Sequence, residues 1–161
     1  MAMQKSAMRS SISFVGLTDG VAARGQDVIL LFGRVLIGWI FITSGWRKLM
    51  DVPAFAKTMP RRNLPEFLGY IAPPVEFLSG VFVLFGFATR YASLMLILFM
   101  IIATFSSHRY WNFTDPQQYQ SQNSNYWKNV SMTGGIVLLF VTGAGRYAID
   151  RLLMRGGSPA K

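Results

Sequence analysis

The sequence predicts an all-α fold, an integral membrane four-helix bundle with short loops. Hydrophobic residues make up 52% of the 161 residues and charged residues only 14%, against roughly 25% charged in an average soluble protein. The apolar residues form four long runs, and the charged residues gather between them, where lipid headgroups would lie. A helical bundle in water would need polar residues at helical spacing, and the run from Leu94 to Ile102 has none.

The middle apolar stretch, from Ile71 to Ser107, is too long for one crossing. As a single helix of 37 residues it would be about 55 Å long, whereas the hydrocarbon of a bilayer is about 30 Å thick. It is therefore predicted to fold back at the segment 86–90, which holds a glycine, a threonine and a charge. The four spans are then predicted at about 28–47, 71–89, 91–107 and 129–145.

Polar segments flank and join these spans. One membrane domain, 28–150, lies between a polar N-terminal tail, 1–27, and a basic C-terminal tail, 151–161. Three prolines interrupt the loop at 47–70 and limit it to a short surface helix at most. The loop at 108–127 is rich in Gln, Asn, Ser and Tyr, and it is predicted to be polar and mobile.

The composition restricts the chemistry. There is no cysteine and one histidine, His108, which excludes disulfides, cysteine-ligated clusters and a haem held by two histidines of this chain. We therefore predict no metal site and no covalently bound cofactor, so that a redox role would depend on a partner or a diffusible ligand. The net charge is +9, but it is not gathered in the patch or stripe of a nucleic-acid-binding protein. We predict no nucleic-acid partner, and the near-equal basic charge on the two sides leaves the orientation undetermined.

Two charged residues lie inside the predicted spans, Arg34 and Glu76. A charge there costs at least roughly 2.5–3.5 kcal/mol on insertion scales. Arg34 lies near the side of the chain termini, as does Asp150, and we expect the two to form a structural ion pair. The alternative is a site for an anionic ligand or a lipid phosphate.

Glu76 lies on the opposite side, where the loops gather acid–base and aromatic groups from distant segments. The candidate ligand or proton site consists of Glu76, His108, Trp46, Arg47, Lys48, Trp111 and Asn129. One interpretation is a capping network that satisfies helix ends. The other is a pocket for an amphipathic ligand such as a quinone, in which aromatic side chains hold a ring and Glu76 or His108 exchanges protons.

Glycines within the spans allow helices to approach closely. We expect this packing role for Gly38, Gly45, Gly80, Gly86, Gly134 and Gly135.

Several of these segments, taken in order, carry a family resemblance. They are 33–38 (GRVLIG), 45–49 (GWRKL), 74–80 (PVEFLSG), 86–90 (GFATR), 108–113 (HRYWNF), 128–129 (KN), 134–135 (GG) and 147–150 (YAID). Their order and spacing over about residues 28–150 resemble the DoxX family of small four-span bacterial membrane proteins. The resemblance implies a bacterial inner-membrane bundle with both termini in the cytoplasm. It also implies a link to redox metabolism, since some relatives are membrane subunits of a thiosulfate:quinone oxidoreductase.

We therefore expect a redox-associated subunit that contacts quinone or lipid near the loop-side membrane face. Its partners would be the bilayer and other membrane or periplasmic subunits. We do not expect an autonomous enzyme, although the chain could serve as the membrane subunit of a quinone-linked oxidoreductase. The alternative is a non-catalytic structural or assembly subunit of a larger respiratory or membrane complex.

Overall fold

The computed structural model describes residues 2–156, with side chains for residue 16 and for 18–154. Within that range all the regular secondary structure is helical. The long helices are α1 (Ala2–Leu49), α3 (Leu68–Phe85), α4 (Thr89–Ser107) and α5 (Pro116–Thr142). The short elements are α2 (Val52–Ala56), η1 (Pro60–Arg62), η2 (Tyr110–Asn112) and α6 (Ile149–Gly156).

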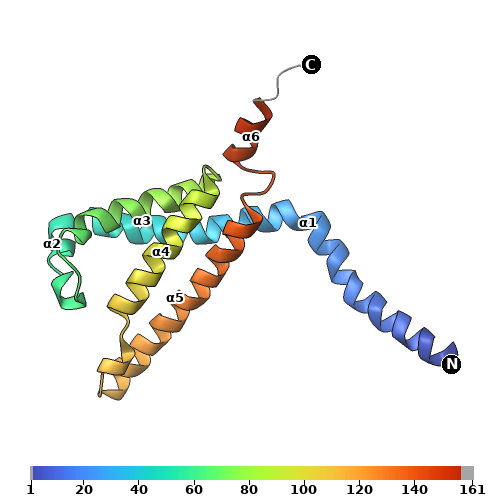
Figure 1. Ribbon diagram of the computed structural model, residues 1–161, viewed down its shortest axis with the longest axis horizontal. Coiled ribbons are helices and arrows are strands. Elements are labelled where there is room, and N and C mark those ends of the chain that lie inside the picture. Colours follow the sequence, from blue (N-terminus) through green and yellow to red (C-terminus); the bar gives the residue numbers. More distant parts are fainter. Residues whose placement is uncertain (1, 157–161) are drawn as a thin grey trace.

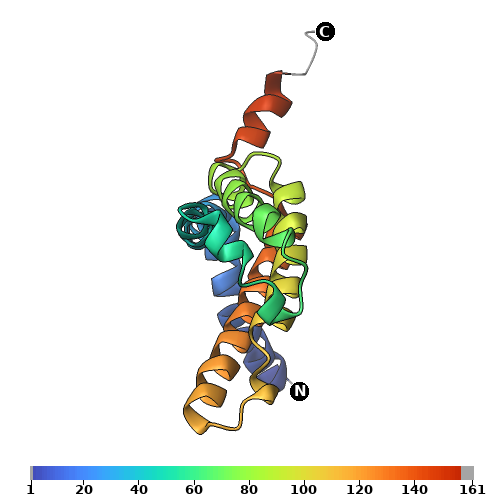
Figure 2. The ribbon, with the colours of Figure 1, turned by 90° about the vertical axis from the view of Figure 1, so that its left-hand side faces the viewer.

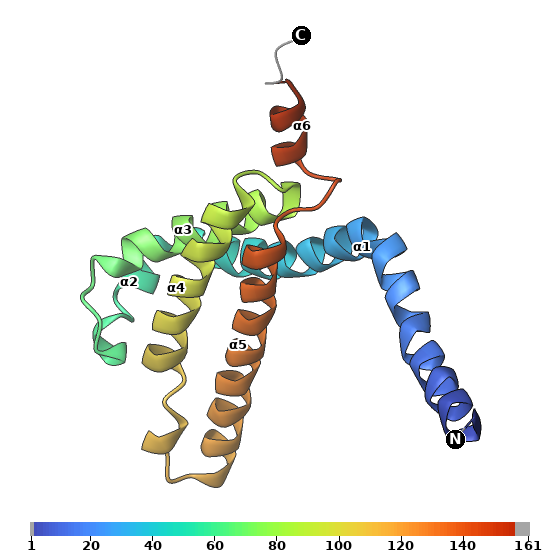
Figure 3. The same ribbon diagram turned by 45° about the vertical axis from the view of Figure 1, so that its right-hand side comes forward.

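The long helices form two pairs (Figure 1). Helix α1 packs along α3, and α4 lies antiparallel to α5. The second pair crosses the first at a steep angle, as Figures 2 and 3 show, and the N-terminal half of α1 turns away from the other helices. The terminal side of the bundle holds the α3–α4 turn, the end of α5 and α6, and the loop side holds α2, η1 and η2.

The exposed surface of the helices is apolar, as a lipid environment requires. Three segments are long and apolar enough to cross a bilayer: Thr18–Leu49, Leu68–Phe85 and Thr89–Asn112. Large side chains along them, such as Phe32 and Trp39, are more than half exposed, which a soluble monomer avoids over so wide an area. Helix α5 is long enough but polar in its first half, so the fourth crossing stays a prediction.

Glycines let α1 and α3 approach until their backbones touch. A Cβ at Gly38 would lie 2.8 Å from the carbonyl oxygen of Gly80, and a Cβ at Gly45 would lie 2.8 Å from the amide nitrogen of Phe77. By contrast, a Cβ at Gly134 would meet nothing within 4 Å, and one at Gly135 would meet only Ile37 at 3.9 Å. Close backbone approach at glycine is therefore seen in the first helix pair and not at these two positions of α5, where a Cβ would fit without a clash.

The helix bounds differ from the predicted spans mainly at the polar segments. Helix α1 begins at Ala2, so the N-terminal tail continues the first span as helix, and α6 occupies the start of the basic C-terminal tail. Helix α5 begins at Pro116, so the prediction of a loop is wrong for residues 116–127. Asp115 accepts a hydrogen bond from the amide of Gln118 at 2.8 Å, and proline follows at the first helical position. That pair is a helix start signal that the polar composition of the segment obscures.

Aromatic rings hold this polar half of α5 against the end of α4. The Tyr126 ring lies edge-on to the rings of Phe105 and Tyr110, with centroids 5.8 Å and 5.4 Å away. Tyr119 also packs edge-on against Tyr110, at 5.5 Å. Such pairs stabilise a structure by roughly 0.5–1.5 kcal/mol each beyond the area they bury, which favours helix over loop here.

Hydrogen bonds of two charged side chains join the segments of the terminal side. Arg34, which is 1% exposed, donates a hydrogen bond to the carbonyl oxygen of Tyr147. Asp150 accepts hydrogen bonds from the amides of Ala88 and Thr89, at 2.6 Å and 3.0 Å. Arg34 thus bonds the segment just before α6, and Asp150 in the first turn of α6 bonds the α3–α4 turn. The two form no direct salt bridge, in contrast to the expected ion pair. The carboxylate is engaged instead by amides that the start of α4 leaves without helical partners.

Candidate functional site

A cavity of about 650 Å³ opens on the loop side, where α1, α2, α3 and α4 meet and the middle of α5 reaches in. Its walls are mostly apolar, with Phe41, Leu68, Leu98, Phe99 and Met132 among them. Ligand pockets are commonly of this size, apolar and equipped with a few convergent polar groups. Here those polar groups come from four different helices and the η1 segment, because the crossing of the two helix pairs leaves room between them.

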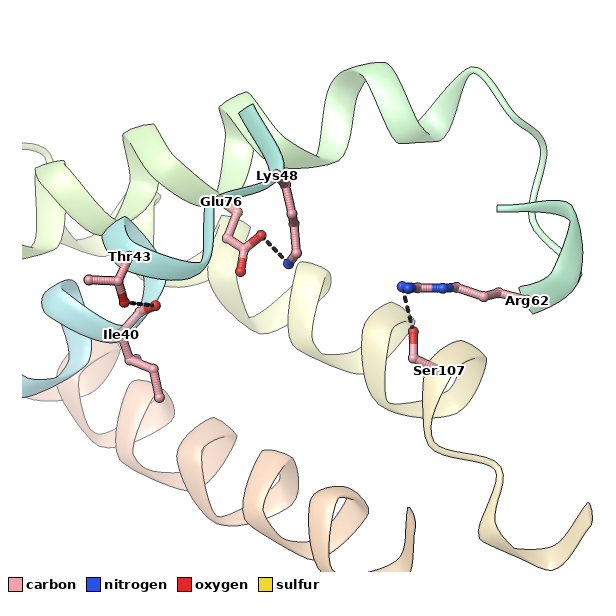
Figure 4. A network of polar contacts seen from close by, with 6 residues as sticks. All are labelled: Ile40, Thr43, Lys48, Arg62, Glu76 and Ser107. Carbon is pink, nitrogen blue, oxygen red and sulfur yellow. Dashed lines mark hydrogen bonds and ion pairs between the residues drawn. The ribbon is translucent and has the colours of Figure 1, made fainter. Parts of the chain in front are cut away.

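The central polar contact is an ion pair between α1 and α3. The Nζ atom of Lys48 lies 2.5 Å from Oε2 of Glu76, whose side chain is 3% exposed (Figure 4). The expected contact between Glu76 and a cation of the first span is thus present. Glu76 points between the helices because it lies on the same face of α3 as Pro73 and Gly80, which are also buried. Removing one partner of a buried pair leaves an uncompensated charge, which costs about 3–5 kcal/mol.

Two phenylalanine rings flank the ammonium group of Lys48. Its Nζ atom lies 5.4 Å from the centroid of the Phe55 ring and 5.5 Å from that of Phe99. The guanidinium carbon of Arg62 lies 5.4 Å from the same Phe55 ring. Cation–π contacts of this kind contribute roughly 0.5–2 kcal/mol. Phe55 therefore links two cations at the mouth of the cavity.

Arg62 connects the loop to the end of α4. Its Nη1 atom donates to Oγ of Ser107 at 3.0 Å (Figure 4). Burial lowers the pKa of the Arg62 guanidinium from its ordinary value, but an arginine remains protonated at neutral pH. Next to Ser107, the Nδ1 atom of His108 lies 2.9 Å from Oε1 of Gln122 in α5. Within residues 18–154 the other ring nitrogen of His108 has no hydrogen-bond partner, which leaves it available to a ligand.

The structure brings together five of the seven predicted site residues. The cavity is lined by Arg47, Lys48, Glu76, His108 and Asn129. Trp46 instead packs on the Phe77 ring at 5.8 Å and is 53% exposed, while Trp111 stacks edge-on against Tyr110 at 5.1 Å. Neither indole lines the cavity, because Trp46 faces outward from α1 and Trp111 belongs to the aromatic cluster of η2.

Sequence reasoning missed the contribution of the 47–70 loop. Phe55, Arg62 and Leu64 all line the cavity. Helix α2 docks on α3 at Gly69, where a Cβ would lie 2.3 Å from the Cα atom of Ala56. Pro53, inside the first turn of α2, and Pro60, which begins η1, were the available signals, because prolines at helix starts indicate ordered turns.

The charge of the site is positive. Three cations (Arg47, Lys48 and Arg62) line it together with one carboxylate, Glu76, which leaves an excess of two positive charges when His108 is neutral. A ligand head that carries oxygen acceptors would suit this balance. In the described part of the chain, no group of three or more His, Asp or Glu side chains could hold a metal ion.

The DoxX family model matches residues 29–109. That range includes the ion pair, the α2–η1 loop and His108. The chain belongs to the DoxX family. It is similar to two inner membrane proteins of Escherichia coli (strain K12). YqjF is 36% identical over 80% of this chain and 94% of the relative, and YphA is 30% identical over 78% of this chain and 91% of the relative.

These relatives and the apolar helices make the chain a bacterial inner-membrane protein. A third relative, named "Putative oxidoreductase CatD", comes from Bacillus subtilis (strain 168). It is 32% identical over 47% of this chain and 56% of its own length. No solved structure matches the chain.

Proposed function

We propose that this DoxX-family protein binds the head group of a quinone in the loop-side cavity, as a redox-associated membrane subunit. The observation that carries the proposal is the ion pair between half-buried Lys48 and buried Glu76 in the wall of an apolar cavity of about 650 Å³. A charged pair in such surroundings is costly, and ionisable residues within spanning helices are by default candidates for function. The name of the Bacillus subtilis relative also favours redox chemistry.

The chemistry of the cavity fits a quinone. Its carbonyl oxygens accept hydrogen bonds, and Arg62, Lys48 and the free ring nitrogen of His108 are donors or become donors on protonation. The ring and its apolar tail would lie against Phe55, Phe99 and the aliphatic wall. Lipid-exposed residues of α4, such as Leu98 and Ile102, also line the cavity, so a hydrophobic ligand could enter from the bilayer.

The role of the chain would be to bind, orient and exchange protons. Interconversion of a quinone and a quinol moves electrons and protons in equal number. The Glu76 carboxylate, ionised in its pair with Lys48, would accept a proton when a quinol is oxidised, and His108 would give or take one. The electrons would be exchanged with a partner subunit. This division of labour agrees with a chain that has no cysteine and one histidine.

The test is titration of the purified protein in mild detergent with decylubiquinone, a short-chain quinone, followed by calorimetry and thermal unfolding. Arg62→Gln should weaken binding about tenfold or more, because a hydrogen bond from a charged donor contributes roughly 1.5–3 kcal/mol. Arg61→Gln is the matched control, since Arg61 is its exposed neighbour and does not line the cavity. Glu76→Gln should also weaken binding, because Lys48 loses the anchor that positions it, whereas Glu66→Gln at an exposed carboxylate should not.

The structural or assembly subunit remains the competing function. It predicts that Glu76→Gln lowers stability and leaves quinone behaviour unchanged. Absence of saturable binding by the unaltered protein, both alone and with its co-purifying partners, would refute the quinone proposal.

A further inference from the structure

A second hollow, of about 840 Å³, lies on the terminal side and is separate from the loop-side cavity. It is bounded by the α3–α4 turn, the end of α5, the segment 143–146 and α6, with Asp27 of α1 at its edge. These are the elements that meet at the top of Figure 1. The hollow plays no part in the function proposed above.

Three exposed arginines line this hollow: Arg90, Arg146 and Arg151. Two carboxylates also line it, but both are engaged by backbone amides. Asp27 accepts from the amide of Arg146 at 2.7 Å, and Asp150 accepts from the amides of Ala88 and Thr89. Among the described side chains, none of the three guanidinium groups forms a salt bridge, so they are available to an external anion.

An independent observation comes from Thr89, which also lines the hollow. Thr89 is 1% exposed, and its hydroxyl oxygen has no hydrogen-bond partner. Buried polar atoms are nearly always paired, so this hydroxyl, on a residue that lines the same hollow as the three arginines, is free to donate to an acceptor. Arg90 has a partly structural role, because its Nη2 atom lies 3.5 Å from the carbonyl oxygen of Val141 at the end of α5.

Apolar side chains share the hollow with these cations. Tyr91, Leu153 and Met154 line it, and all three are more than 60% exposed. In α6 the apolar residues thus lie beside Arg151, the arrangement of a helix that rests in a membrane interface. A phosphate group beside acyl chains is what an anionic phospholipid presents to a protein.

From these contacts we propose that the terminal-side hollow binds a phosphate group, supplied by the headgroup of an anionic phospholipid. Arg146 and Arg151 contact the phosphate, the hydroxyl of Thr89 donates to it, and Leu153 and Met154 contact the acyl chains. A soluble phosphate monoester offers a phosphate group without the chains, and the experiment separates the two sources.

The experiment compares the full chain in phosphatidylcholine nanodiscs that contain increasing phosphatidylglycerol, with the retained lipid counted by native mass spectrometry after gentle release. The double variant Arg146→Gln, Arg151→Gln should retain phosphatidylglycerol about 25-fold more weakly, at about fivefold per arginine. The control variant Lys57→Gln, Arg61→Gln removes two exposed charges from the loop side and should change retention by less than about twofold, since neither residue lies near the hollow. Equal loss in both variants, or loss in neither, would overturn the proposal.

Two further arms complete the test. Thermal stabilisation by soluble glycerol phosphate that disappears in the Arg146→Gln, Arg151→Gln variant would assign the site to a soluble phosphate and overturn the lipid. If the double variant does not fold, Thr89→Val replaces the hydroxyl by a methyl group of the same size. It should lower retention several-fold, and unchanged retention would contradict the assignment.

Discussion

The guanidinium group of Arg34 occupies the space that a side chain at Gly86 would need. A Cβ atom at Gly86 would lie 1.8 Å from Nη1 of Arg34 and 2.6 Å from the Cβ of Ala148. Gly86 also has a φ of 67°, in the left-handed region that favours glycine. One residue without a side chain thus allows a buried cation of α1 to pass the α3–α4 turn and bond the carbonyl of Tyr147.

Replacement of Gly86 by alanine should therefore destabilise the bundle. The positive φ costs about 1–2 kcal/mol, and displacement of a packed side chain costs about 1–3 kcal/mol more. Thermal unfolding in detergent measures the loss. Gly134→Ala is the matched control, because a Cβ there meets nothing within 4 Å, and it should raise helix stability by about 0.5–1 kcal/mol. If Gly86→Ala leaves the stability unchanged, the Arg34 side chain does not need the space beside Gly86.

Arg34→Leu and Asp150→Asn should be non-additive. The two side chains form no salt bridge, but both hold the region where α6 begins: Arg34 bonds the carbonyl of Tyr147 just before α6, and Asp150 in α6 bonds the amides of Ala88 and Thr89. We expect a coupling energy of about 0.5–3 kcal/mol in a double-mutant cycle of unfolding free energies. Additive losses would mean that the two residues stabilise independent parts of the terminal side.

Lys48→Met should destabilise the protein more than the double change Lys48→Met, Glu76→Gln. The single variant leaves the Glu76 carboxylate buried without its cation, at about 3–5 kcal/mol, whereas the double variant leaves a neutral amide there, at about 1–3 kcal/mol. The measurement is the unfolding free energy of the three proteins in one detergent. If the double variant is no more stable than Lys48→Met alone, the ion pair is not the reason that Lys48 is needed.

Both termini should lie in the cytoplasm, with four crossings between them. A reporter that is active only outside the cytoplasm should be active when fused after residue 55 or 114, in the loops that follow α1 and α4. The same reporter should be inactive when fused after residue 89 or 161, because these positions should lie in the cytoplasm. The fusion after residue 161 tests whether α5 crosses the bilayer, because its apolar second half is shorter than a full span. A reporter that is inactive outside and active only in the cytoplasm would, if active after residue 55, show the opposite orientation.

Whether the structure agrees with a prediction depends on the kind of information that the prediction needed. The fold-back at 86–90 was readable because a length limit decided it, and the turn occurs at Gly86–Ala88. The Glu76–Lys48 contact was readable because both residues had to lie at one depth. The partner of Arg34 could not be predicted, because every residue has a backbone carbonyl and none is marked in the sequence as an acceptor. The carbonyl of Tyr147 accepts the hydrogen bond from Arg34 in place of the Asp150 carboxylate.

By itself, the sequence determined the all-α membrane class, the turn between the second and third apolar runs, and the gathering of Glu76, Lys48 and His108 on one side. These depend on apolar length and depth, which are properties of segments. Only the tertiary structure decided that α2 and η1 fold over the loop side and bring Phe55 and Arg62 to the cavity. It likewise decided that the three terminal-side arginines converge. Both outcomes depend on close contacts between segments distant in sequence, that of Ala56 with Gly69 on the loop side and that of Asp150 with Ala88 and Thr89 on the terminal side.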